Sequence, residues 1–201
     1  MASVHRVRLG EEMKKNLHAD VDLIAESDRG VVLIVANDIE QLLESLFKRA
    51  FAGRVSNTIQ EDLFDLNGPL GSLSGKGKLA FAVGLLERPL YDHLDLLRRL
   101  RNQVAHDSKE FSFDAPTTLS LLNSFDIFRQ LVPQWLKKPV VLKPDEPDPE
   151  GALVVSINKF CFIQTFSFMK QLLERNIQHA KPFTDAQFEQ SVRSDDRSAG
   201  S

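Results

Sequence analysis

Apolar residues recur every three or four positions along most of this 201-residue chain, which is the spacing of one face of an α-helix. The predicted long helices cover about residues 29–51, 72–85, 89–106, 116–132 and 152–177. A shorter helix is expected around residues 59–64. Strand-like patterns are scarce, apart from an alternative short strand at 153–157 where the last helix would begin. The predicted fold class is therefore all-α, with the helices in a single multihelical bundle.

Residues that favour helix ends support these boundaries. Ser27 is placed to cap the first helix, and Gly53 follows its end. Pro89 suits the first turn of the third long helix, because an N–H at that position would have no helical partner. An N–H is needed further inside a helix, so the fourth long helix is expected to stop before Pro133.

Two segments lack the helical pattern. Residues 137–151 contain four prolines among acidic residues. We interpret them as an extended loop within one domain, because neither flanking part of the chain would form a self-sufficient domain. Residues 184–201 are mainly Ser, Asp, Arg and Gly, with little apolar surface to offset the entropy cost of ordering. The sequence therefore predicts one helical domain over residues 1–183 and a disordered tail over residues 184–201.

Composition and charge argue against several classes of function. Lys and Arg total 25 against 28 Asp and Glu, so the net charge of -3 provides no overall attraction to DNA. The single cysteine, Cys161, excludes an internal disulfide framework and a zinc site built on several thiolates. The longest apolar run, Val31–Ala36, is too short to cross a membrane, and the histidines show no metal-ligand spacing. We therefore expect a cytoplasmic protein that uses no membrane, metal or other cofactor.

A glycine-rich segment, Gly68–Lys76, leads into the first turn of the second long helix. It is similar to a phosphate-binding loop, but three residues instead of four separate Gly71 from Gly75. Gly77 also replaces the Ser or Thr that would contact magnesium. We interpret the segment as a turn packed against the next helix with its lysines directed outward. That helix is apolar on most faces and is expected to lie centrally in the bundle.

The strongest turn signal in the chain lies within this segment and just before it. The Asn-Gly and Gly-Pro dipeptides at residues 67–69 favour a turn and disfavour a helix. We expect a rigid turn, and its five residues are candidate structural or interaction residues. They are Asn67, Gly68, Pro69, Leu70 and Gly71.

The end of the third long helix carries a second candidate site, formed by Arg101, Asn102 and His106. An arginine followed by a polar residue, with a histidine five positions later, resembles the signature of the HEPN superfamily. Active members of that superfamily are helical, cleave RNA without a metal and typically work as dimers. In such a site the histidine would act as acid or base, and the arginine would stabilise charge in the transition state.

A structural interpretation of the same residues stands beside the catalytic one. On an ideal helix Arg101 and His106 are about 140° apart, so they converge only if the helix ends or distorts, or if a partner subunit completes the site. Arg101 also falls near the middle of the apolar face of its helix. It would then be a buried cation that ties the glycine-rich turn to the helix through carbonyls or through Asp65. Asn102 and His106 would bond to the helix end.

Three blocks in the middle of the chain form a distinctive combination. They are Asp62–Ser74, which contains the turn, Lys78–Leu86, which belongs to the next helix, and Tyr91–Asp107, which contains Arg101 and His106. Together these blocks resemble the mannitol operon repressor family, and about a quarter of the chain carries the resemblance. The resemblance implies an all-helical cytoplasmic protein that negatively regulates sugar-alcohol uptake operons and has no recognisable DNA-binding motif of its own.

The sequence as a whole predicts a mannitol operon repressor-like transcriptional regulator, and not an enzyme. It would act through a protein partner, because no autonomous DNA-binding motif is found and direct DNA binding is disfavoured by charge. The alternative function is a metal-independent endoribonuclease of HEPN type, with RNA as substrate and with Arg101 and His106 as its catalytic residues. Homodimerisation is compatible with either function.

Overall fold

The structure is a computed structural model, and it describes residues 4–10, 20–106, 111–148, 150 and 153–184. The described residues form eight helices, which are α2 (Asp20–Ala25), α3 (Asp28–Ala50), α4 (Asn57–Phe64), α5 (Leu73–Ala82), α6 (Arg88–His106), α7 (Pro116–Leu122), α8 (Asp126–Trp135) and α9 (Ile157–His179). Their three strands are β1 (Arg6–Leu9), β2 (Val141–Leu142) and β3 (Leu153–Ser156). The predicted fold class is confirmed, since the described chain is predominantly helical with one small sheet.

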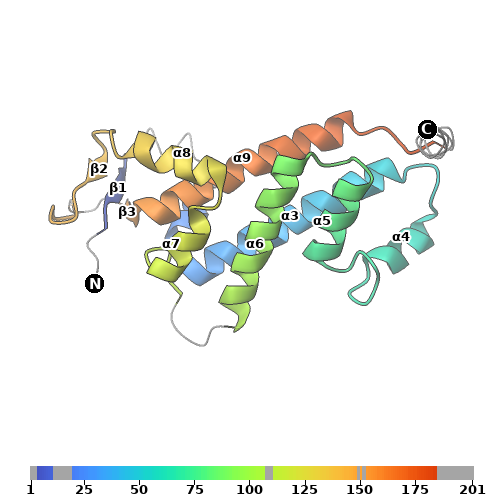
Figure 1. Ribbon diagram of the computed structural model, residues 1–201, viewed down its shortest axis with the longest axis horizontal. Helices are drawn as coiled ribbons and strands as arrows, with labels where there is room; N and C mark the ends of the chain where they lie inside the picture. The colour runs from blue at the N-terminus through green and yellow to red at the C-terminus, as the bar shows by residue number, and fades with distance from the viewer. Residues whose placement is uncertain (1–3, 11–19, 107–110, 149, 151–152, 185–201) are drawn as a thin grey trace, which may run out of the picture.

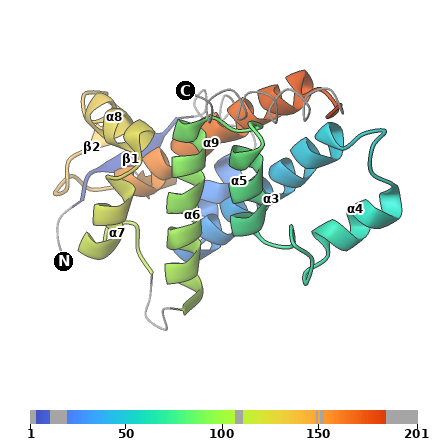
Figure 2. The same ribbon diagram turned by 45° about the vertical axis from the view of Figure 1, so that its right-hand side comes forward.

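Helices α3 and α9 form the centre of the molecule and lie side by side (Figures 1 and 2). Helices α5 and α6 pack against α3, and α8 packs against α9. Figure 1 shows the sheet at one end of the molecule and α4 at the opposite end. None of the described helices combines the length and the apolar composition needed to span a membrane.

Phenylalanine fills the space around α9. Phe162 is central, because its ring centroid lies 4.7 Å from that of Phe166 and 4.8 Å from that of Phe113. Large aromatic side chains bury much apolar area at little cost in side-chain entropy. The fully buried phenylalanines are Phe47, Phe113, Phe125, Phe128, Phe160, Phe162 and Phe166.

Serine caps begin several of the helices at the predicted places. The side chain of Ser27 accepts a hydrogen bond from Gly30 N at 3.0 Å, which confirms it as the cap of α3. Ser72 caps α5 in the same way, through Gly75 N at 3.1 Å. Each hydroxyl satisfies a backbone N–H that has no helical partner.

The short strand predicted before the last helix is confirmed as β3, and it belongs to a three-stranded antiparallel sheet of order β2-β1-β3. Val7 pairs with Val155 of β3 and with Val141 of β2. Strand β1 was not predicted from the sequence, because four residues are too short for a period of two to stand out. Val7 and Leu9 are buried, so β1 closes one end of the core.

The prediction of one helix over 116–132 is wrong in two respects. The helix is interrupted between α7 and α8, where the backbone N–H groups of Ser124 and Phe125 each donate to a carbonyl only three residues back, at 3.0 Å. Helix α8 then continues through Pro133 to Trp135. Leu136 N donates to Val132 O at 3.0 Å, so the helix loses a single backbone bond at the proline. Of the predicted disordered tail, residues 185–201 lie outside the described residues.

Candidate functional site

The glycine-rich turn joins α4 to α5 and is built from close backbone contacts. Leu70 N donates to Leu63 O at 2.9 Å, which fastens the turn to the end of α4. A Cβ atom on Gly68 would lie 2.3 Å from Asp62 O, and one on Gly71 would lie 2.2 Å from Asp65 O. Both distances are far below a normal contact, so only glycine fits at these two positions without a backbone shift.

The same turn exposes apolar surface. Leu70 is buried, whereas Leu66 is 85% exposed and Pro69 is exposed. Between the turn, α5 and the end of α3 lies a hollow of about 510 Å³, which we call the apolar hollow. Its lining residues are Phe51, Leu63, Pro69, Leu70, Gly75, Lys78, Leu79 and Ala82. Lys78 brings the one charged side chain among them.

Lys76 fixes α5 to α3 beneath this surface. Its side chain is almost fully buried, with Nζ 3.0 Å from Glu40 Oε1 and 3.7 Å from Glu44 Oε2, both on α3. The ring centroid of Phe64 lies 5.8 Å from the same nitrogen. The prediction of outward lysines is therefore wrong for Lys76, which lies on the side of α5 that faces α3. Lys78 is exposed, as predicted.

Helix α5 is also less central than its composition predicted. Leu79 is 37% exposed and Ala82 is exposed, since both line the apolar hollow instead of the core. The opposite side of α5 is covered by α3 and α6. An apolar helix face can thus belong to an open surface, which the periodicity of the sequence does not distinguish from a buried face.

The prediction that Arg101 is a buried cation is wrong, because its side chain is exposed. Leu73 and Ser74, at the start of α5, line one small surface recess together with Arg98 of α6. Toward the end of α6 the buried side chains are those of Leu97, Leu100 and Val104, whereas Ala105 is exposed like Arg101. Arg101 therefore lies at the edge of the buried stripe of α6 and not at its centre, where the ideal helical wheel placed it.

The structure does not bring Arg101 to the glycine-rich turn. Figures 1 and 2 show the end of α6 and the turn on opposite sides of α5. Asp65 serves its own turn instead, since its Oδ1 accepts from Asn67 N at 3.0 Å and its carbonyl accepts from Gly68 N at 2.8 Å. The end of α6 is held by Arg29 of α3, whose Nη1 donates to Val104 O at 2.6 Å.

The remaining candidates at the end of α6 are only partly described. Asn102 is half-buried, and α6 is helical up to His106, but the side chain of His106 lies outside the described residues. The ribonuclease alternative depends on the distance between the Arg101 and His106 side chains, and it therefore stays a prediction. Across the described part of the chain, no group of three or more His, Cys, Asp or Glu is arranged to hold a metal ion.

Comparison with known proteins gives a family match. The model of the mannitol repressor family, MtlR, matches residues 24–194. Over 53 residues the chain is 42% identical to the mannitol operon repressors of Escherichia coli strain K12 and strain O6:H1. That alignment spans 26% of this chain and 27% of the length of these curated relatives.

Solved structures share the fold at low sequence identity. The MtlR chain in the X-ray structure of the MtlR–HPr complex from Escherichia coli is 16% identical, with a TM-score of 0.55 over 77% of this chain and 97% of that one. The possible transcriptional regulator YggD from Shigella flexneri 2a is 12% identical, with a TM-score of 0.59 over 80% of this chain and 98% of that one. At these identities the likeness extends to the fold alone.

Proposed function

Since this chain belongs to the mannitol repressor family, we propose that it is a cytoplasmic transcriptional regulator that acts through a protein partner. The observation that carries the proposal is the family match over residues 24–194. The partner we propose is an HPr-like protein, because one solved chain of the same fold is in complex with HPr.

The apolar hollow is the surface we assign to this partner. The fully buried centre of a protein–protein interface is depleted in charged residues, and the hollow contains one charged side chain, Lys78, among eight lining residues. Two further exposed apolar side chains lie at the same end of the molecule. They are those of Ile59 in α4 and Leu66 in the turn. The turn that presents this surface is held rigid by its close backbone contacts, so little conformational entropy is lost on binding.

The basic residues of α6 favour a protein partner over DNA. Arg98 and Arg99 both contact Asp95, at 2.9 Å each, so part of their charge is already neutralised. Burial works to raise the pKa of Asp95, but the hydrogen bonds and charges of Arg98 and Arg99 outweigh it and lower the pKa below its usual value. Asp95 is therefore ionised at neutral pH and competes with phosphate for both arginines.

Calorimetric titration of the purified chain with HPr from the same organism tests the proposal. Wild type is expected to bind, and Leu79→Asp is expected to weaken binding by at least about tenfold, because it places a charge in the hollow. Leu33→Asp on α3 is the matched control, since Leu33 is 39% exposed against 37% for Leu79. It should leave the affinity within about twofold of wild type.

Two results would contradict this assignment. Equal losses in the two variants would show that the hollow is not the interface, and no heat of binding for wild type would remove HPr as the partner. Tight binding of operator DNA that weakens steeply with added salt would instead indicate direct phosphate contacts.

A further inference from the structure

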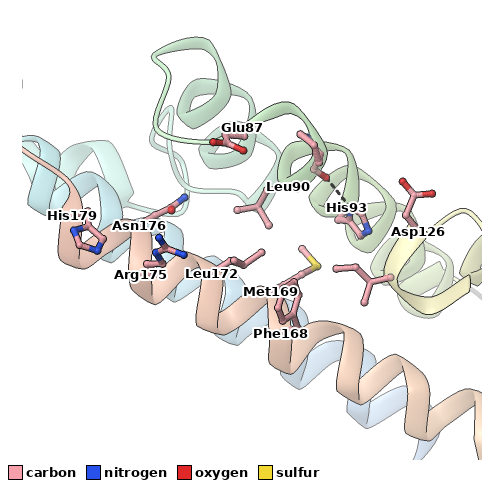
Figure 3. Close-up of a pocket in the computed structure, with 12 residues that line it drawn as sticks. Glu87, Leu90, His93, Asp126, Phe168, Met169, Leu172, Arg175, Asn176 and His179 are labelled. Atoms are coloured by element: carbon pink, nitrogen blue, oxygen red, sulfur yellow. Dashed lines mark hydrogen bonds between the residues drawn. The ribbon is translucent and has the colours of Figure 1, made fainter. Parts of the chain in front are cut away.

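A second concave surface lies on another side of the molecule, between α6, α8 and α9 (Figure 3). We call it the α6–α9 groove, and its volume is about 620 Å³, within the range of small-molecule sites. Leu90 of α6 and Met169 and Leu172 of α9 give it apolar walls. Glu87, Asp126 and Arg175 bring charged groups to it.

The His93 side chain at this groove has one ring nitrogen, Nε2, without a hydrogen-bond partner among the described residues. The side chain is only 7% exposed and points from α6 toward the space between α6 and α9 (Figure 3). Its Nδ1 lies 2.7 Å from Pro89 O. A carbonyl only accepts hydrogen bonds, so Nδ1 carries a proton, and in the neutral ring Nε2 is left with a free lone pair.

Nε2 of His93 has no hydrogen-bond partner among the described residues. A buried polar atom without a partner costs free energy, and most such atoms in proteins are paired. The ring of Phe125 lies 5.7 Å from that of His93 between centroids, and it offers no donor to a nitrogen lone pair. The fold thus holds a buried acceptor at the wall of a groove that also has apolar walls.

We propose that the α6–α9 groove binds a small organic molecule with an apolar body and one hydrogen-bond donor, a hydroxyl or a ring N–H. The apolar body would lie against Leu90, Met169 and Leu172, and the donor would meet His93 Nε2 after a small shift of the side chains that cover this nitrogen. This site is separate from the apolar hollow, and the proposal does not depend on the proposed function.

Indole and 1-methylindole form a matched pair of probes, since they share an apolar body and only indole has an N–H. We would titrate each into the ¹⁵N-labelled full chain and follow the backbone amides and the imidazole nitrogens by NMR. Indole is expected to bind several-fold more tightly, on the order of three- to tenfold, and to shift the Nε2 signal of His93. The amide shifts should map to α6 and α9.

His93→Phe keeps the ring and removes the acceptor, so it should bind both probes equally. Leu172→Trp should block both, because it fills the groove, whereas Leu33→Trp on α3 should bind as wild type does. If His93→Phe does not fold, the wild-type chain alone tests the proposal, through the shift of the His93 Nε2 signal when indole binds. The proposal is overturned if neither probe binds, if both bind wild type equally, or if the shifts map to the apolar hollow.

Discussion

The α4–α5 end of the molecule and its α3–α9 centre are stabilised in different ways. Helix α9 has eleven buried residues, whereas α4 has none. The centre is held by the volume of many phenylalanine side chains, while the α4–α5 end is held by a few specific contacts at Gly68, Gly71 and Lys76. A region stabilised by few contacts can leave apolar surface open, and the apolar hollow lies at this end.

The largest effect is expected for Gly71→Ala at the α4–α5 end. The added methyl would overlap Asp65 O, so the turn has to move, and we expect the free energy of unfolding to fall by about 3 kcal/mol. Urea unfolding followed by circular dichroism measures this change. HPr affinity should fall in the same variant, because the turn borders the apolar hollow.

Gly77→Ala is the matched control within α5. The nearest atom to its added methyl is Leu94 Cδ1 at 4.0 Å, an ordinary contact. Because alanine favours a helix interior over glycine, this variant should be more stable than wild type by about 0.5 to 1 kcal/mol. Similar losses in both variants would show that the turn is not held by close backbone contacts.

A loss of about 2 kcal/mol is expected for Lys76→Met. The substitution leaves Glu40, whose side chain is 21% exposed, without its cation. The double variant with Glu40→Leu should recover most of the loss, since no unpaired charge then remains. Lys78→Met, on the exposed side of α5, should change the free energy of unfolding by less than about 0.5 kcal/mol. Equal effects of the two lysine variants would refute a specific role for the Lys76 pair.

The centre of the molecule can be probed through Cys161. Burial raises the pKa of its thiol from the usual 9.0 to about 12. Above pH 9 the unfolded chain loses this proton while the folded chain keeps it, so stability falls as pH rises. Between pH 8 and pH 10 the expected loss is about 1.4 kcal/mol. Cys161→Ala should lack this contribution, and an identical pH dependence in both chains would contradict it.

Periodicity predicted α3, α6 and α9 well, because each of these long helices buries a stripe of side chains that the sequence shows directly. The signal was insufficient where structure depends on a distant segment. Strand β1 is formed by pairing with β2 and β3, which are distant in sequence, and the interruption between α7 and α8 places the Phe125 ring in the core. Neither partner can be read from the local sequence.

The candidate sites also differ in whether they depend on local sequence or on contacts between distant segments. The turn at Gly68 and Gly71 was predicted from local dipeptides, and its geometry is local. The apolar hollow and the environment of His93 depend on how helices meet, so they were not predicted. Exposed apolar positions such as Leu79 were present in the sequence, but their pattern also fits a buried helix face.

Arg101 tests the helical-wheel prediction most directly, because its place on the apolar face predicted burial, whereas its side chain is exposed while those of Leu100 and Val104 are buried. We expect Arg101→Ala to change the free energy of unfolding by less than about 0.5 kcal/mol. Arg98→Ala should cost more, up to about 1 kcal/mol, since Arg98 is partly buried and bound to Asp95. Urea unfolding of both variants measures these two free-energy changes.

A loss above about 2 kcal/mol for Arg101→Ala would restore the buried-cation interpretation. If stability is unchanged but metal-independent RNA cleavage by the wild-type chain is lost, the residue is catalytic.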